Sequence, residues 1–191
     1  MTIIGLCGVA GSGKTTIAKH LVKHHGFVRL PFAGPLKAMA AAFGLGPREL
    51  AGDLKEVPSD LLCGRTPRQF MQLLGTEFGR ELIGEDVWVR AWERALGDLA
   101  SDGFRPLRVV ADDMRFPNEA AAIRARGGVV IHLVREGAGS ASGSGHSSER
   151  PELLGGVEVA NDLSEARTAA HVMRLAQLPA GDGQRRALLS S

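Results

Sequence analysis

Residues 8–15 read Gly8-Val9-Ala10-Gly11-Ser12-Gly13-Lys14-Thr15, which matches the pattern G-x-x-x-x-G-K-[ST] at every fixed position. The apolar run at residues 3–7 precedes it and is typical of a short buried strand. A helical pattern follows and ends at Gly26. Its expected buried face is Ile17, Ala18, Leu21 and Val22. Because a strand before and a helix after are the setting in which this pattern binds phosphate, we interpret residues 8–15 as a P-loop.

The residue types in this loop suit a nucleoside triphosphate. Glycines let the backbone curl so that N–H groups point at an anion, and the helix that begins there adds its positive end. We expect Lys14 to bridge the β- and γ-phosphates and the Thr15 hydroxyl to bind Mg²⁺. The expected contacts with ATP are Gly8, Gly11, Ser12, Gly13, Lys14, Thr15 and Thr16.

A second acidic signal lies at the end of a later strand. The apolar stretch 107–111 runs directly into Asp112 and Asp113. A carboxylate in such a place can serve the magnesium ion, usually through water. The spacing does not say which of the two does so, and both could instead cap the next turn.

The rest of the chain alternates between strand and helix patterns. Further strands are expected at 27–30, 129–134 and 157–160, and helices at 35–43, 66–78, around Trp88 and Trp92, at 118–126 and at 164–178. Inward positions expected on the second and third helices are Leu36, Met39, Ala40 and Phe43, then Phe70, Leu73, Leu74 and Phe78. This alternation predicts an α/β fold with a parallel sheet joined by right-handed crossovers.

One domain is expected over residues 1–178, with two special segments inside it. Residues of about 34–104 are too many for one crossover, so they predict a helical subdomain. Residues of about 135–151 are rich in glycine and serine and fit either a linker or a lid; we favour a lid, because the residues beyond complete the same domain. Residues 179–191 lack an apolar pattern and are predicted to be disordered.

Composition narrows the class of protein. The 191 residues are 44% hydrophobic and 23% charged, with a net charge of +2, which disfavours a role in coating nucleic acid. Cys7 and Cys63 have no metal-type spacing, and no apolar run reaches membrane-spanning length. We therefore expect a cytoplasmic protein that acts on small molecules and binds neither a nucleic acid polymer nor a membrane. Whether it forms a homodimer is left open.

Arginines at the ends of elements favour a kinase among P-loop proteins. The chain has no Asn-Lys-x-Asp tetrad for guanine recognition. It does place cations at Arg65, Arg68, Arg80, Arg115 and Arg135. Phosphoryl transfer between two anions needs such positive charge around the reacting oxygens. By position, the strongest catalytic candidates are Arg68, Arg115 and Arg135.

Five segments outside the P-loop carry further motifs, and two of them, Leu74-Gly75-Thr76-Glu77 and the Asp-x-Arg-Phe-Pro-Asn-Glu segment that begins at Asp113, are far more specific than the loop itself. The five are Phe32-Ala33-Gly34-Pro35-Leu36-Lys37, then Pro67-Arg68-Gln69 with Gln72-Leu73-Leu74-Gly75-Thr76-Glu77-Phe78-Gly79-Arg80, then Asp113-Met114-Arg115-Phe116-Pro117-Asn118-Glu119, His146-Ser147-Ser148-Glu149 and Asn161-Asp162. In this order they resemble the bacteriophage deoxynucleoside monophosphate kinase family, within the P-loop nucleoside monophosphate kinases. The resemblance runs from the P-loop to about Leu178.

The resemblance implies a three-layer P-loop kinase fold with strand order 2-3-1-4-5 and transfer from ATP to a deoxynucleoside 5′-monophosphate. It implies catalytic roles for Lys14, Arg68, Arg80, Asp113, Arg115 and Arg135. The metal contacts Thr15, Asp112 and Asp113 are expected from the P-loop and the strand end, and Asp112 is a second acid that departs from the family's pattern. The resemblance places Asn161 near the adenine. The implied acceptor contacts are Phe32, Lys37, Arg68, Gln72, Arg80, Trp88, His146 and Glu149.

Several alternatives remain open from the sequence. Trp88 and Phe32 fit either stacking on a base or plain core packing. Another small-molecule P-loop kinase, such as one acting on dephospho-coenzyme A, would share most of these motifs. A nucleotide-dependent regulatory module would share the loop but lack an acceptor. The accepted bases and the tolerance for ribose do not follow from the sequence.

Overall fold

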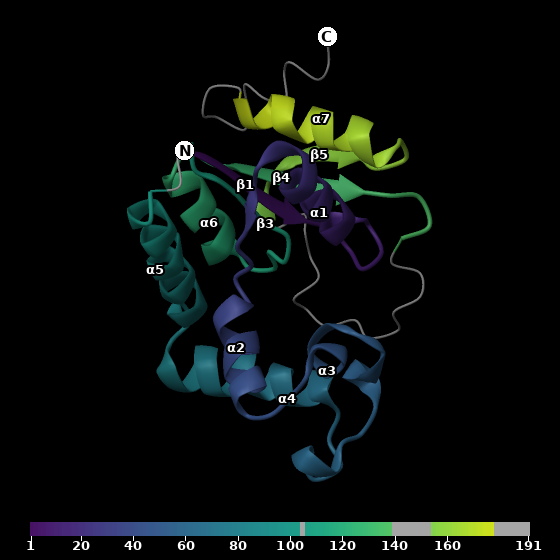
Figure 1. Ribbon diagram of the computed structural model, residues 1–191, viewed down its shortest axis with the longest axis vertical. Helices are drawn as coiled ribbons and strands as arrows, with labels where there is room; N and C mark the ends of the chain where they lie inside the picture. The colour runs from purple at the N-terminus through teal and green to yellow at the C-terminus, as the bar shows by residue number, and fades with distance from the viewer. Residues whose placement is uncertain (104–105, 139–153, 178–191) are drawn as a thin grey trace. The chain divides into compact units, whose positions relative to one another are not determined.

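The computed structural model describes residues 1–103, 106–138 and 154–177. Its sheet has five parallel strands in the order β2-β3-β1-β4-β5 (Figure 1), which confirms the expected fold class and strand order. The strands are β1 (Thr2–Cys7), β2 (Val28–Arg29), β3 (Arg108–Ala111), β4 (Val129–Val134) and β5 (Val157–Ala160).

The chain divides into two compact units. The first comprises Met1–Pro31 and Ala95–Ser191 and holds the sheet with α1 (Lys14–His25), α6 (Pro117–Ala125) and α7 (Glu165–Gln177). The second, Phe32–Arg94, is helical and is called the helical unit below. It contains α2 (Gly34–Ala42), α3 (Pro47–Ala51), the 3-10 turns η1 (Asp53–Glu56) and η2 (Asp60–Leu62), α4 (Pro67–Leu73), the π-helix η3 (Leu74–Ile83) and the start of α5 (Val87–Ser101).

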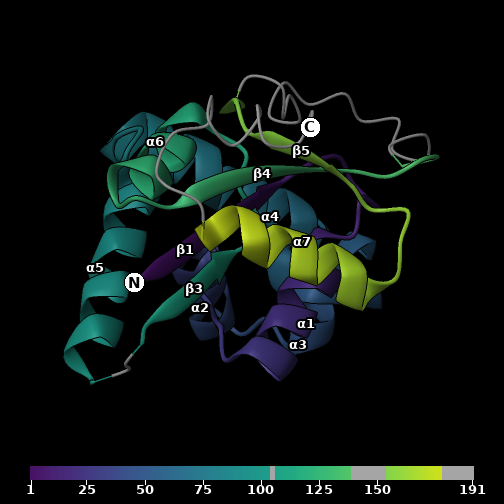
Figure 2. The same cartoon turned by 90° about the horizontal axis from the view of Figure 1, so that it is seen from above.

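Helices cover both faces of the sheet in the first unit (Figure 2). Alternate strand residues pack with α1 and α7 into one core that includes Ile4, Leu6, Ile131 and Leu133. On the opposite face, α6 and Met114 lie against Gly5, where an added Cβ would overlap the Met114 sulfur. Burial of apolar residues on both faces is typical of a parallel sheet. Ile17, Ala18 and Leu21 are buried as expected, but Val22 is 40% exposed, because the buried stripe of α1 is narrower than predicted.

The helical unit has a small core of its own. Leu36, Ala40, Leu45, Leu62, Met71 and Trp88 are buried together in it. A capping box starts α4: the Gln69 backbone nitrogen donates to the Thr66 hydroxyl at 3.2 Å, and the Thr66 backbone nitrogen donates to the Gln69 side-chain oxygen at 2.9 Å. Between residues 44 and 64 the chain forms only short helical elements.

Three apolar side chains that were expected inside this unit are exposed. Met39 is 43% exposed because α2 buries only the positions one turn apart, Leu36 and Ala40. Phe43 is 53% exposed, although its ring lies 5.0 Å from that of Phe70, because it follows the end of the helix. Phe78 is 42% exposed because it lies in η3, where the i→i+5 repeat shifts side chains off an α-helical stripe.

The π-helix is the feature of this unit that the sequence did not predict. It covers the segment from Leu74 to Ile83, which carries much of the family resemblance. Trp88 packs on it, since its indole N–H donates to the Gly75 carbonyl at 2.8 Å. A Cβ at Gly79 would lie 2.6 Å from the Trp88 ring. Trp88 is therefore packed tightly against the backbone at Gly75 and Gly79.

Some expectations fall outside the described residues. They are His146, Glu149, most of the expected lid and the segment 179–191. Across the residues that are described, no helix combines the length and the apolar character needed to cross a membrane.

Candidate nucleotide-binding site

The P-loop has a backbone that only glycine adopts easily at three positions. Gly8, Gly11 and Gly13 have φ angles of 141°, 81° and 92°. A Cβ at Gly8 would also lie 2.5 Å from the Leu133 carbonyl oxygen and 2.7 Å from the Ser12 hydroxyl. The loop therefore needs glycine at Gly8 both for its conformation and for its close contact with the end of β4.

Lys14 lies at the first position of α1, directly after the loop. Its ammonium group donates to the carbonyl oxygens of Gly8, at 2.7 Å, and Val9, at 2.8 Å. The N-cap of this helix, Gly13, has no side chain to cap the first-turn amides, and the first turn holds no acidic residue. A helix N-terminus with an ammonium group and no nearby first-turn carboxylate is a favourable place for a phosphate.

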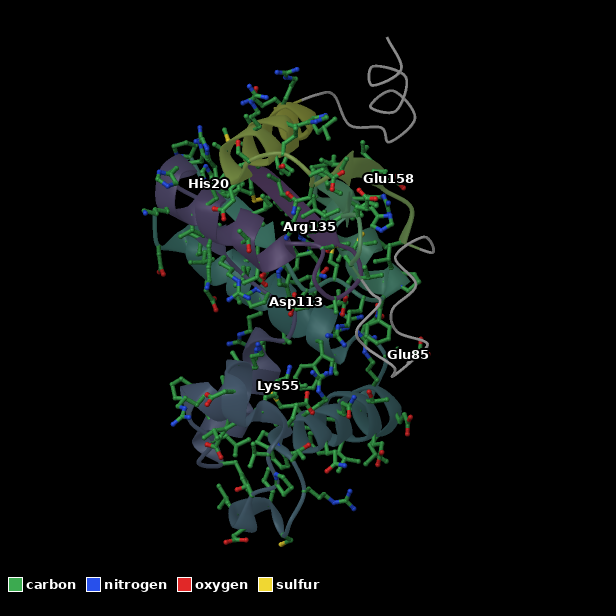
Figure 3. The ribbon with its side chains drawn as sticks, turned by 90° about the vertical axis from the view of Figure 1, so that its right-hand side faces the viewer. His20, Lys55, Glu85, Asp113, Arg135 and Glu158 are labelled. Carbon is green, nitrogen blue, oxygen red and sulfur yellow. The ribbon has the colours of Figure 1, made fainter. Side chains whose placement is uncertain are left out.

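The two adjacent aspartates after β3 differ in their surroundings. Asp112 is 3% exposed, and its Oδ1 accepts a hydrogen bond from Arg29 Nε at 2.8 Å. This hydrogen bond is the main reason that the pKa of Arg29 is raised above its ordinary value. The other oxygen of Asp112 is buried without a hydrogen-bond partner. Asp113 is half-buried (Figure 3). The carboxylate of Asp112 is thus committed to a structural ion pair.

Magnesium is compatible with these residues. Within 1–103, 106–138 and 154–177, no group of three or more His, Cys, Asp or Glu is arranged to hold a metal ion. A nucleotide-bound Mg²⁺ does not need such a group, because it takes most of its ligands from phosphates and water. Thr15, in the first turn of α1, and the carboxylates after β3 supply the hard oxygen donors that this ion prefers.

Glu119 is a residue whose role the sequence reasoning missed. It is 4% exposed, and its Oε2 accepts hydrogen bonds from the backbone nitrogens of Arg115, at 2.7 Å, and Phe116, at 3.2 Å. The buried carboxylate therefore fixes the turn that presents Arg115, whose own side chain is exposed. Pro117 followed two residues later by Glu119 is a helix-start signal that could have revealed it.

The helical unit carries the predicted acceptor contacts. Arg68 is 44% exposed in its side chain and forms an ion pair with Glu56. Arg80 donates to the Glu85 carbonyl at 3.0 Å. Lys37 is half-buried and Gln72 is exposed. The two arginines thus already have partners inside this unit.

The two aromatic candidates lie in the core of the helical unit. Phe32 is 2% exposed and stacks on Trp92 with ring centroids 4.8 Å apart. Trp88 is 7% exposed and packs against Gly79. Neither ring offers a surface for stacking on a base in this structure, so the core-packing alternative describes both.

The remaining predicted residues follow β4 and β5. Arg135 is exposed and begins the turn after β4 (Figure 3). Asn161 follows β5, and its amide nitrogen donates to the Ser12 carbonyl at 2.8 Å. The side chain of Asn161 therefore contacts the P-loop itself.

Comparison with known proteins identifies the family of this chain. The family described as deoxynucleotide monophosphate kinase matches residues 64–155. A protein of Acanthamoeba polyphaga mimivirus, provisionally named a deoxynucleotide monophosphate kinase, is 36% identical over 159 residues, which are 78% of this chain and 81% of that protein. The chain belongs to the deoxynucleotide monophosphate kinase family.

A second relative and a solved structure complete the comparison. The deoxynucleoside-5′-monophosphate kinase of Escherichia phage T5 is 38% identical over 82 residues, which are 42% of this chain and 30% of that kinase. A solved structure from Thermus thermophilus has a TM-score of 0.49 and 21% identity, and the match covers 93% of this chain and 97% of that chain. Family membership makes this chain a kinase, and the strand order alone establishes its fold.

Proposed function

We propose that this kinase transfers the γ-phosphoryl group of Mg-ATP to a deoxynucleoside 5′-monophosphate, giving ADP and the diphosphate. The observation that supports this most is the intact P-loop, with Lys14 at the N-terminus of α1, in a chain of this family. In the reaction, an acceptor phosphate oxygen bonds to the γ-phosphorus and the bond from that phosphorus to the β–γ bridging oxygen breaks. The acceptor oxygen is already ionised at neutral pH, so no general base is needed.

The contribution of the chain is to bring two anions together and to offset their repulsion. Lys14 would leave the carbonyls of Gly8 and Val9 and donate to the β- and γ-phosphates. Arg115 and Arg135, both exposed, would supply further positive charge to the transferred group. On the acceptor side, Arg68 and Arg80 would bind the monophosphate, with Lys37 and Gln72 beside them.

We assign the magnesium role to Thr15 and Asp113. Asp112 is a weaker candidate because its carboxylate is buried and paired with Arg29. When bound, Mg²⁺ would neutralise charge on the triphosphate. Asp113→Asn should therefore raise the Mg²⁺ concentration needed for half-maximal ATP binding, which calorimetry measures without turnover. An unchanged Mg²⁺ requirement would contradict the assignment.

The test of the function is an ADP-release assay with dAMP, dCMP, dGMP and dTMP, each beside its ribose counterpart and beside dephospho-coenzyme A. We expect at least one deoxynucleotide to stimulate ADP formation well above the rate without acceptor. Stimulation by dephospho-coenzyme A alone would show a different small-molecule kinase. The same slow rate with every acceptor would point to a regulatory module and would overturn the proposal.

A further inference from the structure

Asn161 connects the end of the sheet to the P-loop across 149 positions of sequence. Its backbone nitrogen donates to the Val134 carbonyl at 2.7 Å, which anchors it to the end of β4. Its side-chain amide donates to the Ser12 carbonyl at 2.8 Å. Figure 2 shows β4 and β5 side by side, with the chain continuing from β5 into α7. Asn161 is therefore anchored to β4 by its backbone and bound to the P-loop by its side chain.

The hydrogen bond fixes the orientation of one loop peptide. A trans peptide is planar, so its C=O and N–H point to opposite sides. Holding the Ser12 carbonyl toward Asn161 directs the Gly13 N–H the other way. A phosphate-binding loop works by directing N–H groups at the anion, which requires that its carbonyls be held elsewhere. Asn161 supplies that restraint for the peptide between Ser12 and Gly13.

The packing around this contact leaves little room for another arrangement. Ser12 is fully buried, so its carbonyl would lose a partner if the amide of Asn161 were removed. A Cβ at Gly13 would overlap the Asn161 amide nitrogen. The close approach of Asn161 is therefore a second reason, besides a φ of 92°, that the loop needs glycine at this position.

We infer that Asn161 is a positioning residue for the triphosphate, acting through the P-loop, and not a contact for the adenine ring. The inference rests on the proposed binding of ATP but not on the identity of the acceptor. The two roles differ in what they predict for a ligand without a base. A residue that orients the loop matters equally for ATP and for inorganic tripolyphosphate, whereas an adenine contact matters only for ATP.

The experiment measures dissociation constants of Mg-ATP and Mg-tripolyphosphate by calorimetry, without acceptor, for the wild type and Asn161→Ala. We expect both constants to rise by about tenfold and by the same factor, as loss of one buried hydrogen bond would give. Glu158→Gln, an exposed change on the strand that leads to Asn161, is the matched control and should leave both unchanged.

Asn161→Leu provides a second variant that keeps the approximate size and shape of the side chain, removes the donor and adds no charge. If Asn161→Ala does not fold, as judged from its thermal melt, the comparison of ligands is made with Asn161→Leu, which should also weaken both. Weaker binding of ATP alone, or no change for either ligand, would overturn the inference. If the wild type binds both ligands but phosphorylates no deoxynucleotide, the proposed function fails, and the inference is still decided by how the variants bind the two ligands. If the wild type binds neither, both fail.

Discussion

The P-loop and the helical unit hold their charged groups in different ways. In the P-loop with Lys14, called the cradle below, Lys14 donates to the nearby carbonyls of Gly8 and Val9. Two further contacts come from distant parts of the chain: Gly8 fits against Leu133, and Asn161 donates to Ser12. In the helical unit, Arg68 and Arg48 are exposed and pair with the nearby carboxylates of Glu56 and Asp53. The conformation of the cradle is therefore fixed by contacts with distant parts of its own unit, whereas Arg68 and Arg48 are held only by nearby exposed carboxylates.

The largest effect is expected from removing the ammonium group of the cradle. Lys14→Ala should lower kcat on the order of a thousandfold or more, because the reacting phosphates lose their only lysine from the P-loop motif. Lys19→Ala, at an exposed position of the same helix, should have wild-type turnover. The readout is ADP release under saturating ATP, with circular dichroism to show that both variants are folded. Wild-type-like turnover of Lys14→Ala would refute the cradle assignment.

A glycine pair tests how tightly the cradle is packed. Gly8→Ala should lower the free energy of unfolding by about 3 kcal/mol, because the new Cβ is both strained and within 2.5 Å of the Leu133 oxygen. Gly26→Ala also has a positive φ, but its Cβ would meet no atom within 4 Å, so only about 1 kcal/mol of strain is expected. Urea titrations of the two variants measure the difference. Equal losses would show that the contact with β4 is unimportant.

Two aspartate–arginine pairs allow the stability contribution of a buried carboxylate to be compared with that of an exposed one. Asp112→Asn should lower the free energy of unfolding by about 2 kcal/mol, a value discounted because the Arg29 side chain is 38% exposed. Asp53→Asn removes the partner of Arg48, at 3.0 Å, from a pair that is exposed on both sides. It should leave the urea midpoint unchanged. A similar shift for both variants would contradict the distinction between the two regions.

The smallest effect is expected on the acceptor side. Arg68→Ala should raise the KM for the deoxynucleotide about tenfold and leave the dissociation constant of ATP unchanged, because one exposed charge contact to a phosphate is lost. Arg48→Ala is the control, since it removes another exposed, ion-paired arginine from the same unit. The experiment combines initial rates with ATP calorimetry. If Arg68→Ala changed the affinity for ATP and left the KM for the deoxynucleotide unchanged, Arg68 would act on ATP and not on the acceptor.

The sequence predicted the first unit better than the helical unit, for a physical reason. The mostly apolar run 129–134 is rich in β-branched residues and follows a glycine pair, which favours a strand, and glycine at Gly26 sets the end of α1, so these bounds follow from local chemistry. In the helical unit, the exposed positions of Met39 and Phe78 depend on a narrow core and on a π-helix. Neither has a periodicity that distinguishes it from an ordinary amphipathic helix.

In the candidate site too, some residues could be predicted from the sequence and some contacts could not. The P-loop residues could be predicted because their chemistry is contained in eight consecutive residues. The different surroundings of Asp112 and Asp113 depend on the contact of Asp112 with Arg29, which lies 83 positions away from Asp112. The contact of Asn161 with Ser12 likewise depends on how β5 ends beside the loop. Contacts of this kind become visible only in the folded chain.

The central claim is that the N-terminus of α1, with its glycine loop and Lys14, encloses a triphosphate. The most direct measurement is a calorimetric titration of the full chain with Mg-ATP and with a non-hydrolysable analogue. The account predicts saturable binding of both ligands at one site per chain, weakened in Lys14→Ala and unchanged in Lys19→Ala. Absence of heat and of saturable binding with the wild type would contradict it.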